Sequence, residues 1–295
     1  MKILLATDGS EYSEKAAEFL TRLHLTPDDE IIILHAVSWI PIMNEWAAVY
    51  SDIKELQNEV VPKILDATSN VLKTVKAKIT TSYAEDYPDK AIVDASEESG
   101  VDLVVMGARG IRGIKSHIIG SVTKLVAINS HKPVLIIKPP QEDISDTLKI
   151  LFASDGSVYS DAMGTVLSSI PFPEDTELNI LNVIPTVFED IPERFAMEIN
   201  DRIKNIVAGT RAEELKTSEE IIEKAYNNLS GKFATIEKIT KFGDSSVEIL
   251  NAAESSDTDV IAIGTGGMRG IKGMLGSVSR YILNHSKCSI LIGKS

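Results

Sequence analysis

The sequence predicts an α/β protein made of two tandem Rossmann-like, doubly wound domains, each with a five-stranded, mostly parallel sheet between helices. Three observations lead to this fold class. Short apolar runs alternate with helical patterns along the 295 residues. Runs such as residues 31–34, IIIL, are apolar at every position, as strands buried on both faces are. The second half also repeats the first, so one domain plan is expected twice.

The repeat is clearest at the start of each half. Residues 2–10, KILLATDGS, match residues 149–157, KILFASDGS. Between the halves, residues 139–147 contain two prolines followed by polar residues, which is typical of a linker. The predicted organisation is a first domain over 1–140, a linker over 141–147 and a second domain over 148–295.

The strands are expected where the apolar runs lie. In the first half they fall near residues 2–7, 31–37, 78–84, 102–107 and 133–138. In the second half they fall near 149–154, 177–184, 235–241, 259–264 and 289–293. Helical spacing predicts one helix face made of Ile53, Leu56, Val60, Ile64, Thr68, Val71 and Val75. The second half gains about ten residues near its corresponding helix, within 192–230.

A glycine-rich stretch follows the fourth predicted strand of each half. Residues 107–115, GARGIRGIK, return as residues 264–272, GTGGMRGIK. A Gly-Ser pair then opens a helical segment, at Gly120 in the first half and at Gly276 in the second. A strand, a glycine loop and a helix N-terminus in this order form a phosphate site, because backbone N–H groups and the helix dipole attract anions.

The charge distribution favours a small anionic ligand over nucleic acid. The chain has a formal net charge of −13. Residues 103–141 and 260–295, which contain the glycine loops, nevertheless carry basic side chains and no carboxylate. Most of the surface would repel a polyanion, whereas a small phosphate needs only the local potential of one loop.

Composition also limits the compartment and the cofactors. No run approaches the roughly eighteen apolar residues of a membrane span. The apolar stretch at the N-terminus is too short for a signal peptide, because a charged residue, Asp8, already ends it. The single cysteine, Cys288, excludes an intramolecular disulfide framework and a cysteine zinc site. The five histidines show no metal-ligand spacing. We expect a cytoplasmic protein with no metal site of its own and no membrane partner.

These residues make the chain similar to the universal stress protein family, in its tandem two-domain form. ATP-binding members carry G-x2-G-x9-G-[S/T] after strand four, and Gly107, Gly110, Gly120 and Ser121 fit that spacing. The resemblance implies that Asp8 lies beside the adenosine and that the glycine loop holds the phosphates. The binding residues it implies in the first half are Ala6, Thr7, Asp8, Ala36, Met106, Gly107, Arg109, Gly110, Gly120, Ser121, Val122 and Thr123.

Three of these side chains are expected to assist the loop directly. Arg109 would neutralise a phosphate, and the hydroxyls of Ser121 and Thr123 would add donors. The Asp8 carboxylate has a second possible role, since an aspartate before Gly-Ser also accepts hydrogen bonds from the turn and caps the following helix. Contact with the ligand and capping of the helix both stay open as roles of Asp8.

The second half departs from the family pattern. Only eight residues separate Gly267 from Gly276, and Gly266 stands at the arginine position, which removes a cation with five N–H donors. The residues that remain compatible with a nucleotide are Asp155, Val183, Gly264, Gly267, Gly276, Ser277, Val278 and Ser279. The second half therefore binds a nucleotide, binds a different ligand, or serves mainly as the partner of the first.

For function, the resemblance implies an ATP-binding stress-response or signalling module, with ATP bound alone or with Mg²⁺. The state of the ATP would change assembly or partners. No catalytic residue is predicted, and at most slow ATP hydrolysis is expected. Two alternatives stay open: a dimerisation scaffold that binds no nucleotide, and an enzyme of the adenine-nucleotide α-hydrolase type. The latter class usually shows an S-G-G-x-D-S loop, where this chain has TDGS at residues 7–10.

The resemblance also implies how the chain assembles. Single-domain relatives pair through their last strands, here residues 133–138 and 289–293. A tandem chain can form that pair within itself, which leaves no free strand edge there. We expect intramolecular pairing of the two halves, with a homodimer as a further possible assembly.

Overall fold

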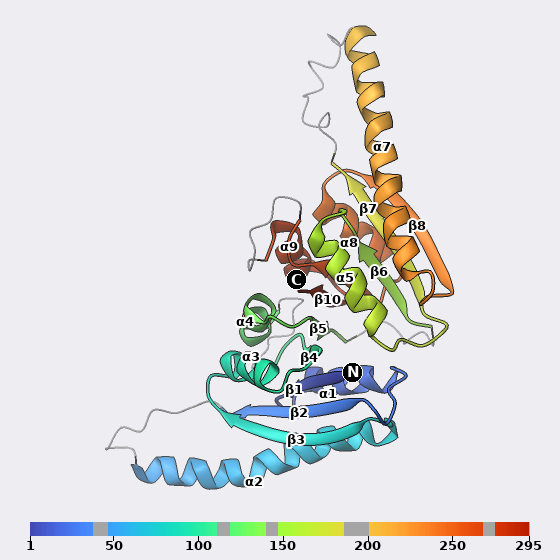
Figure 1. The fold of residues 1–295 in the computed structure, drawn as a ribbon. Coiled ribbons are helices and arrows are strands. Elements are labelled where there is room, and N and C mark those ends of the chain that lie inside the picture. Colours follow the sequence, from blue (N-terminus) through green and yellow to red (C-terminus); the bar gives the residue numbers. More distant parts are fainter. Residues whose placement is uncertain (38–46, 111–118, 140–146, 186–200, 268–274, 295) are drawn as a thin grey trace. The chain divides into compact units, whose positions relative to one another are not determined.

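The computed structural model describes residues 1–37, 47–110, 119–139, 147–185, 201–267 and 275–294 (Figure 1). The predicted linker, apart from Thr147, and residues 111–118 and 268–274 of the glycine loops lie outside this set. The chain forms two compact units. The first contains Met1–Ile144, Ser169–Pro173 and Leu283–Lys294, and the second contains Ser145–Ser168 and Glu174–Ile282.

The first unit is built on a six-stranded sheet. Its order is β3-β2-β1-β4-β5-β10, with the first five strands parallel and β10 antiparallel to β5. The strands are β1 (Lys2–Thr7), β2 (Glu30–Val37), β3 (Lys78–Glu85), β4 (Leu103–Gly107), β5 (Val134–Ile137) and β10 (Ser289–Gly293). Its helices are α1 (Glu11–Thr21), α2 (Ala47–Val71), the 3₁₀ turn η2 (Leu72–Thr74), α3 (Pro88–Glu98) and α4 (Ser121–Asn129).

The second unit repeats the plan with four parallel strands in the order β9-β6-β7-β8. They are β6 (Lys149–Ala153), β7 (Glu177–Ile184), β8 (Thr235–Phe242) and β9 (Val260–Gly264). The helices are α5 (Val158–Ser169), α7 (Asp201–Leu229), α8 (Ser245–Ser255) and α9 (Ser277–His285), the last of which ends in the first unit. The predicted α/β fold class is confirmed, and each of the ten predicted strands lies within one residue of its observed bounds.

The core is formed by strands covered on both faces. Ile3, Leu4 and Leu5 are consecutive in β1 and each is fully buried, as expected for a parallel sheet between helices. Helix α1 begins where the Ser10 side chain accepts a hydrogen bond from the Ser13 amide, and it carries acidic residues in its first turn. Both features satisfy or complement the free N–H groups of a helix N-terminus.

The helix face predicted around α2 is wrong at Leu56 and Val60, while the side chain of Ile53 lies outside the described residues. Leu56 is 61% exposed and Val60 is 40% exposed, whereas the buried row consists of Val61, Leu65 and Thr68. Helix α2 runs past the sheet (Figure 1), so its earlier turns have no strand to cover. The sequence period identified a helix but not which of its turns meets the sheet.

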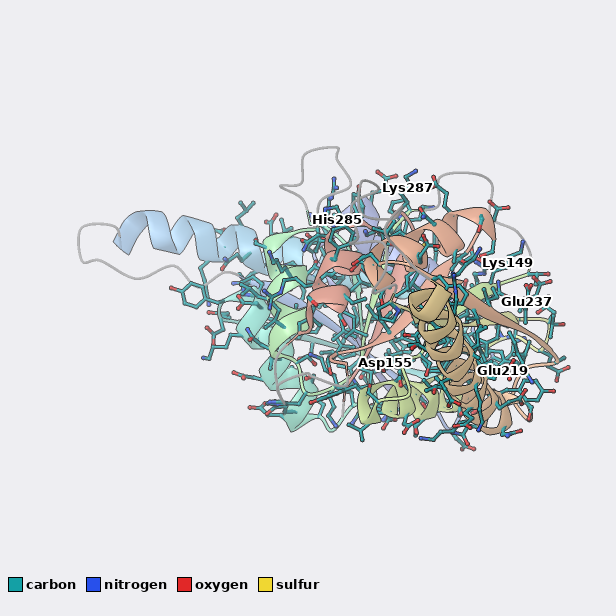
Figure 2. All side chains as sticks on the ribbon, turned by 90° about the horizontal axis from the view of Figure 1, so that it is seen from above. Lys149, Asp155, Glu219, Glu237, His285 and Lys287 are labelled. Carbon is teal, nitrogen blue, oxygen red and sulfur yellow. The ribbon has the colours of Figure 1, made fainter. Side chains whose placement is uncertain are left out.

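Helix α7 is also long, and among its described side chains the buried ones lie in its later turns. With 29 residues it is longer than α2, which has 25, in line with the predicted gain of residues in this region. Among the side chains described in α7, residues 209–229, the buried ones are Ser218, Ile222, Ala225 and Leu229, toward its C-terminal end. Glu219 on α7 and Glu237 on β8 lie at the outside of the second unit (Figure 2), where both are exposed.

Two lysines follow the antiparallel pair of β5 and β10, whose register is centred on Leu135 and Leu291. Lys138 comes directly after β5, and its Nζ donates to the carbonyl of Ser286, just after α9. Lys294 comes directly after β10, and its Nζ donates to the carbonyl of Ala127, 2.8 Å away, in the last turn of α4. Carbonyls at a helix C-terminus lack intrahelical partners, and a cation there also complements the helix dipole.

Burial makes these lysines easier to deprotonate. It lowers the pKa of Lys294 from 10.5 to about 8. Burial also lowers the pKa of Lys138 to about 8; the nearby Cys288 opposes this shift, and the charge of Arg109 adds to it. An ammonium group removed from water loses hydration that one or two carbonyls replace only in part.

We predict that the free energy of unfolding rises between pH 8 and pH 10.5. Below pH 8 each lysine is protonated in both states; between the two values the folded chain releases its proton while the unfolded chain keeps it. The contribution of each lysine to the free energy of unfolding is therefore fully present above pH 10.5 and is lost as the pH falls through 8, by roughly 3 kcal/mol per lysine. Urea unfolding at a series of pH values from 7 to 10 measures how the free energy of unfolding depends on pH. Lys294→Met should reduce the pH dependence by roughly half, because Lys138 still contributes, and an unchanged slope would contradict the assignment.

Candidate nucleotide site

The site begins at the end of the fourth strand of each half, where a helix approaches the backbone very closely. A Cβ added to Gly107, the last residue of β4, would lie 2.6 Å from the carbonyl carbon and oxygen of Tyr12 in α1. A Cβ added to Gly264, the last residue of β9, would lie 2.8 Å from the same atoms of Tyr159 in α5. Only glycine permits this contact, and it fixes the first helix of each half beside the glycine loop.

An aspartate then joins the first strand of each half to the same loop. The Asp8 Oδ1 accepts hydrogen bonds from the amide of Ser10 (3.0 Å) and from its hydroxyl (2.5 Å). Its Oδ2 lies so close to Gly110 that a Cβ there would overlap it. Asp155 repeats the arrangement: Oδ1 accepts from the Ser157 amide at 3.0 Å, and Oδ2 lies 2.9 Å from the Cβ position of Gly267. One oxygen thus holds the turn and the other faces the loop.

The hydroxyl at the third position of the next helix braces the strand end. The Thr123 hydroxyl donates to the carbonyl of Gly107 at 3.0 Å, and Ser279 donates to the carbonyl of Gly264 at 2.7 Å. Thr123 was expected to add a donor to a phosphate, but its proton is directed to this buried carbonyl. The first-turn amides of α4 and α9 are thereby held at the edge where the strands end.

The second strand of each half contributes a polar side chain to this edge. His35 Nδ1 lies 2.8 Å from the Thr7 carbonyl, and Asn182 Nδ2 donates to the Ser154 carbonyl at 2.7 Å. These bonds hold the carboxyl ends of adjacent strands together. Ala36, implied as a binding residue by the resemblance, and Val183, compatible with a nucleotide, follow directly in the chain.

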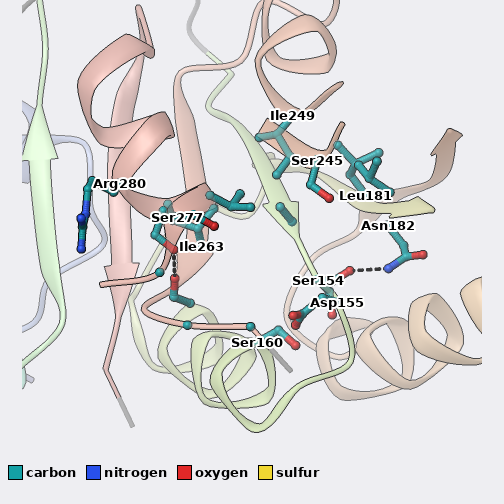
Figure 3. A pocket seen from close by; sticks show the side chains of 18 of the residues that line it. Ser154, Asp155, Ser160, Leu181, Asn182, Ser245, Ile249, Ile263, Ser277 and Arg280 are labelled. Atoms are coloured by element: carbon teal, nitrogen blue, oxygen red, sulfur yellow. Dashed lines mark hydrogen bonds between the residues drawn. The ribbon is translucent and has the colours of Figure 1, made fainter. Parts of the chain in front are cut away.

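These elements surround a cavity of about 410 Å³ in the second unit (Figure 3). Asp155, from the turn after β6, and Ser277, from the start of α9, come to it from different elements (Figure 3). All eight residues predicted for the second half line it. The other lining residues are Ala153, Ser154, Ser160, Leu181, Asn182, Ser245, Ile249, Ile263, Gly266, Leu275 and Arg280.

Two groups of lining residues were missed by the sequence reasoning. Ser154 and Asn182 are polar residues at the ends of apolar strands, a signal that was present in the sequence. Ser245 and Ile249 come from α8, which begins after the edge strand β8. Nothing local marks them, since only the parallel topology brings the start of α8 to the carboxyl edge.

In the first half, the twelve predicted residues divide by accessibility. Asp8, Ala36, Gly110, Gly120, Ser121 and Val122 are exposed or half-buried, and a ligand can reach them. Ala6, Thr7, Met106, Gly107, Arg109 and Thr123 are buried. The Thr7 hydroxyl, for example, lies 3.0 Å from that of Thr68 and 3.2 Å from that of Ser13, within the core. The buried residues support the framework of the site, and burial does not exclude them from its lining, because Gly264 and Ser279, the counterparts of Gly107 and Thr123, are buried and line the second-half cavity.

Arg109 belongs to that supporting group. It is 6% exposed, and its guanidinium carbon lies 5.6 Å from the ring centroid of Tyr12, a cation–π distance. Its charge also acts on Lys138, whose pKa it lowers. Arg109 was expected to neutralise a phosphate, but the structure directs it toward Tyr12 and the end of β5.

Two further properties concern metals and membranes. Among the described residues, no group of three or more His, Cys, Asp or Glu side chains is placed to hold a metal ion. Over the same residues, every helix falls short of the length and apolarity needed to cross a bilayer.

The strand order, the repeated strand-end glycines and the two copies of the plan define a tandem, Rossmann-like α/β protein. The model of the universal stress protein family matches residues 1–138 and again residues 147–294. The chain therefore belongs to the universal stress protein family, with two copies of its domain.

Relatives of both one and two domains are similar to this chain. A universal stress protein of Methanocaldococcus jannaschii is 30% identical over 147 residues, covering 48% of this chain and 84% of its own length. A solved universal stress protein from Archaeoglobus fulgidus matches 99% of this chain and 98% of its own, with a TM-score of 0.62 and 21% identity. A universal stress protein solved in complex with cAMP is 25% identical over 46% of this chain and 95% of its own, with a TM-score of 0.33.

We predict that the close approach at Gly107 is essential for stability. Gly107→Ala places a methyl group against the Tyr12 backbone and should destabilise the protein by about 2–4 kcal/mol. Gly209→Ala in α7 is the control, because among the described residues nothing lies within 4 Å of its Cβ position; it should be neutral or slightly stabilising. Urea unfolding compares the two variants, and equal stability would contradict the prediction.

Proposed function

We propose that the protein is a tandem nucleotide-binding universal stress protein, with ATP held in its first half and a nucleotide in its second. One observation carries this proposal: the cavity of about 410 Å³ where Asp155, the glycine loop and the start of α9 meet. Pockets of this size, largely apolar with a few converging polar groups, are typical small-molecule sites. The matching geometry around Asp8, Gly107 and α4 supports the same role for the first half.

The chemistry of these groups suits an adenine nucleotide. The amides of a helix N-terminus and the absence of a Cβ in the loop favour a phosphate. A carboxylate at the strand edge accepts hydrogen bonds from ribose hydroxyls, as acidic residues do in dinucleotide sites. The motif spacing of Gly107, Gly110, Gly120 and Ser121 matches the ATP-binding members of the family.

We propose that the bound nucleotide acts as a signal, changing the assembly or the partners of a cytoplasmic stress-response protein. Pairing of the two repeats through their last strands is part of this proposal. The antiparallel register of β5 and β10 supports it, as do the reciprocal bonds of Lys138 and Lys294 to helix C-termini. A single rotational correlation time for both repeats, measured by NMR relaxation, is expected.

A calorimetric titration of nucleotide-free protein with ATP and Mg²⁺ tests the first site. Asp8→Ala should weaken ATP binding at least tenfold, because it removes the carboxylate that faces the loop. Asp66→Ala on the exposed side of α2 is the matched control, since it changes the net charge equally, and it should leave binding unchanged. No binding of ATP or AMP at millimolar concentration would overturn the proposed function.

A further inference from the structure

We propose that the free edge of β3 is an interaction surface for a second copy of this chain, whose own β3 pairs with it antiparallel about a two-fold axis at Thr81. This inference goes beyond the proposed function, because it concerns a strand that carries none of the predicted binding residues and requires no nucleotide. It is carried by the exposure of the β3 edge, by the contrast with β8 in the other repeat and by the charges at the two ends of β3.

Strand β3 lies at the edge of the sheet in the first unit. Among the described strands it pairs with β2 alone (Figure 1). It has eight residues, more than the typical strand of about five or six. The consecutive residues 81–83 are all exposed, and Tyr83 is 58% exposed. An edge strand of this kind presents a row of unpaired N–H and C=O groups with which another strand can pair.

Strand β8 occupies the corresponding edge in the second unit and allows a comparison position by position. Lys78 begins β3 opposite Glu30, the first residue of β2. Thr235 begins β8 opposite Glu177, the first residue of β7. Each strand has eight residues, so every residue of β3 has one counterpart in β8.

The comparison shows that β8 carries protection against pairing that β3 lacks. Natural edge strands discourage pairing with other chains by carrying charged residues, above all lysine. Strand β8 carries three exposed charged residues within it: Glu237, Lys238 and Lys241. The counterparts in β3 are Thr80, Thr81 and Ala84, and the run ITTSYA over residues 79–84 contains no charge. Its β-branched and aromatic residues favour a strand, so the edge of β3 is suited to pairing.

The charges of β3 lie at its ends and favour an antiparallel copy. Lys78 begins the strand, Glu85 ends it and Asp86 follows. An antiparallel copy brings the basic start of one strand beside the acidic end of the other, at both ends of the pair. The side chains of Lys78 and Glu85 have partners in their own chain, Glu30 and Lys54, but are 70% and 39% exposed, so a second chain can reach them. A parallel copy would bring like charges together, which destabilises a strand pair.

Side-chain pairing selects Thr81 as the centre of the interface. Under a two-fold axis normal to the sheet, the central residue faces its own copy and the residues on either side face one another. With Thr81 at the centre, Ile79 lies opposite Tyr83 of the second copy, and Thr80 lies opposite Ser82. Aromatic with β-branched residues and Thr with Ser are favourable cross-strand pairs. A centre one residue later would place Ile79 opposite a carboxylate instead.

Sedimentation equilibrium of the nucleotide-free full chain, from micromolar to millimolar concentration, tests the surface. A reversible monomer–dimer equilibrium is expected. Thr81→Lys brings two like charges together at the axis and should raise the dissociation constant of the dimer at least tenfold. Thr235→Lys adds the same charge at an exposed position of β8 and is the matched control, so it should leave the constant unchanged.

Three results of this experiment would overturn the inference. One is a monomer at every concentration. Another is a series of species larger than the dimer, which would indicate open-ended pairing of β3 with β8. The third is a dimer that Thr81→Lys does not weaken, because such a dimer uses a different surface. Thermal unfolding followed by circular dichroism checks that both variants are folded.

A cross-link tests the register without disrupting the pair. In a chain whose single cysteine is replaced, Cys288→Ser, the change Thr81→Cys places two thiols opposite each other at the axis. Directly opposite Cα atoms lie about 4.5–5.5 Å apart, within the range of about 4.4–6.8 Å that a disulfide requires. Mild oxidation should convert more than half of this chain to a covalent dimer on a non-reducing gel, whereas Thr235→Cys in the same background should remain largely monomeric.

Equal cross-linking of the two cysteine variants, or none at residue 81, would overturn the inference. Both experiments use nucleotide-free protein, so their failure would leave the proposed function standing. Failure of ATP to bind in the calorimetric titration would likewise leave the β3 interface standing.

Discussion

The contact on which both sites depend is the approach of a helix backbone to the last residue of a strand. In each half the first helix reaches the end of the fourth strand at Tyr12 or Tyr159, and a glycine without a Cβ allows it. That approach brings the aspartate after the first strand against the second glycine of the loop. The hydroxyl of Thr123 or Ser279 then holds the following helix to the same strand end. A turn, a loop and a helix N-terminus are thereby fixed at one edge of the sheet.

The two halves keep this framework and differ in what surrounds it. The first half buries a cation, Arg109, beside Tyr12, whereas the second closes Tyr159 over Gly266. The shared contacts form the framework of the candidate site in each half, and the differences lie at the positions around it. The buried lysines after β5 and β10 show the opposite trend, since both halves retain the same contact with a helix C-terminus.

Strand positions were predictable from sequence because buried parallel strands are apolar at consecutive positions, and that pattern is local. The placement of Asp155, Gly264 and Ser277 around one cavity was also predictable, since parallel strands carry their carboxyl ends to the same edge. The exposed positions of Leu56 and Val60 were not, because helical spacing does not reveal where the sheet ends. Nor was the direction of the Arg109 side chain, which depends on the ring of Tyr12 and on the end of β5, distant in sequence.

The central claim is that a nucleotide lies at the carboxyl edge of the strands, over the glycine loop and the helix N-terminus. Amide chemical-shift mapping of the ¹⁵N-labelled full chain, titrated with AMP, tests it most directly. The largest shifts should fall on Asp155, Gly264, Gly276, Ser277 and Val278, which line the cavity of the second unit. Shifts concentrated on the edge strand β8 or on the exposed part of α7, with none at the cavity, would contradict the account.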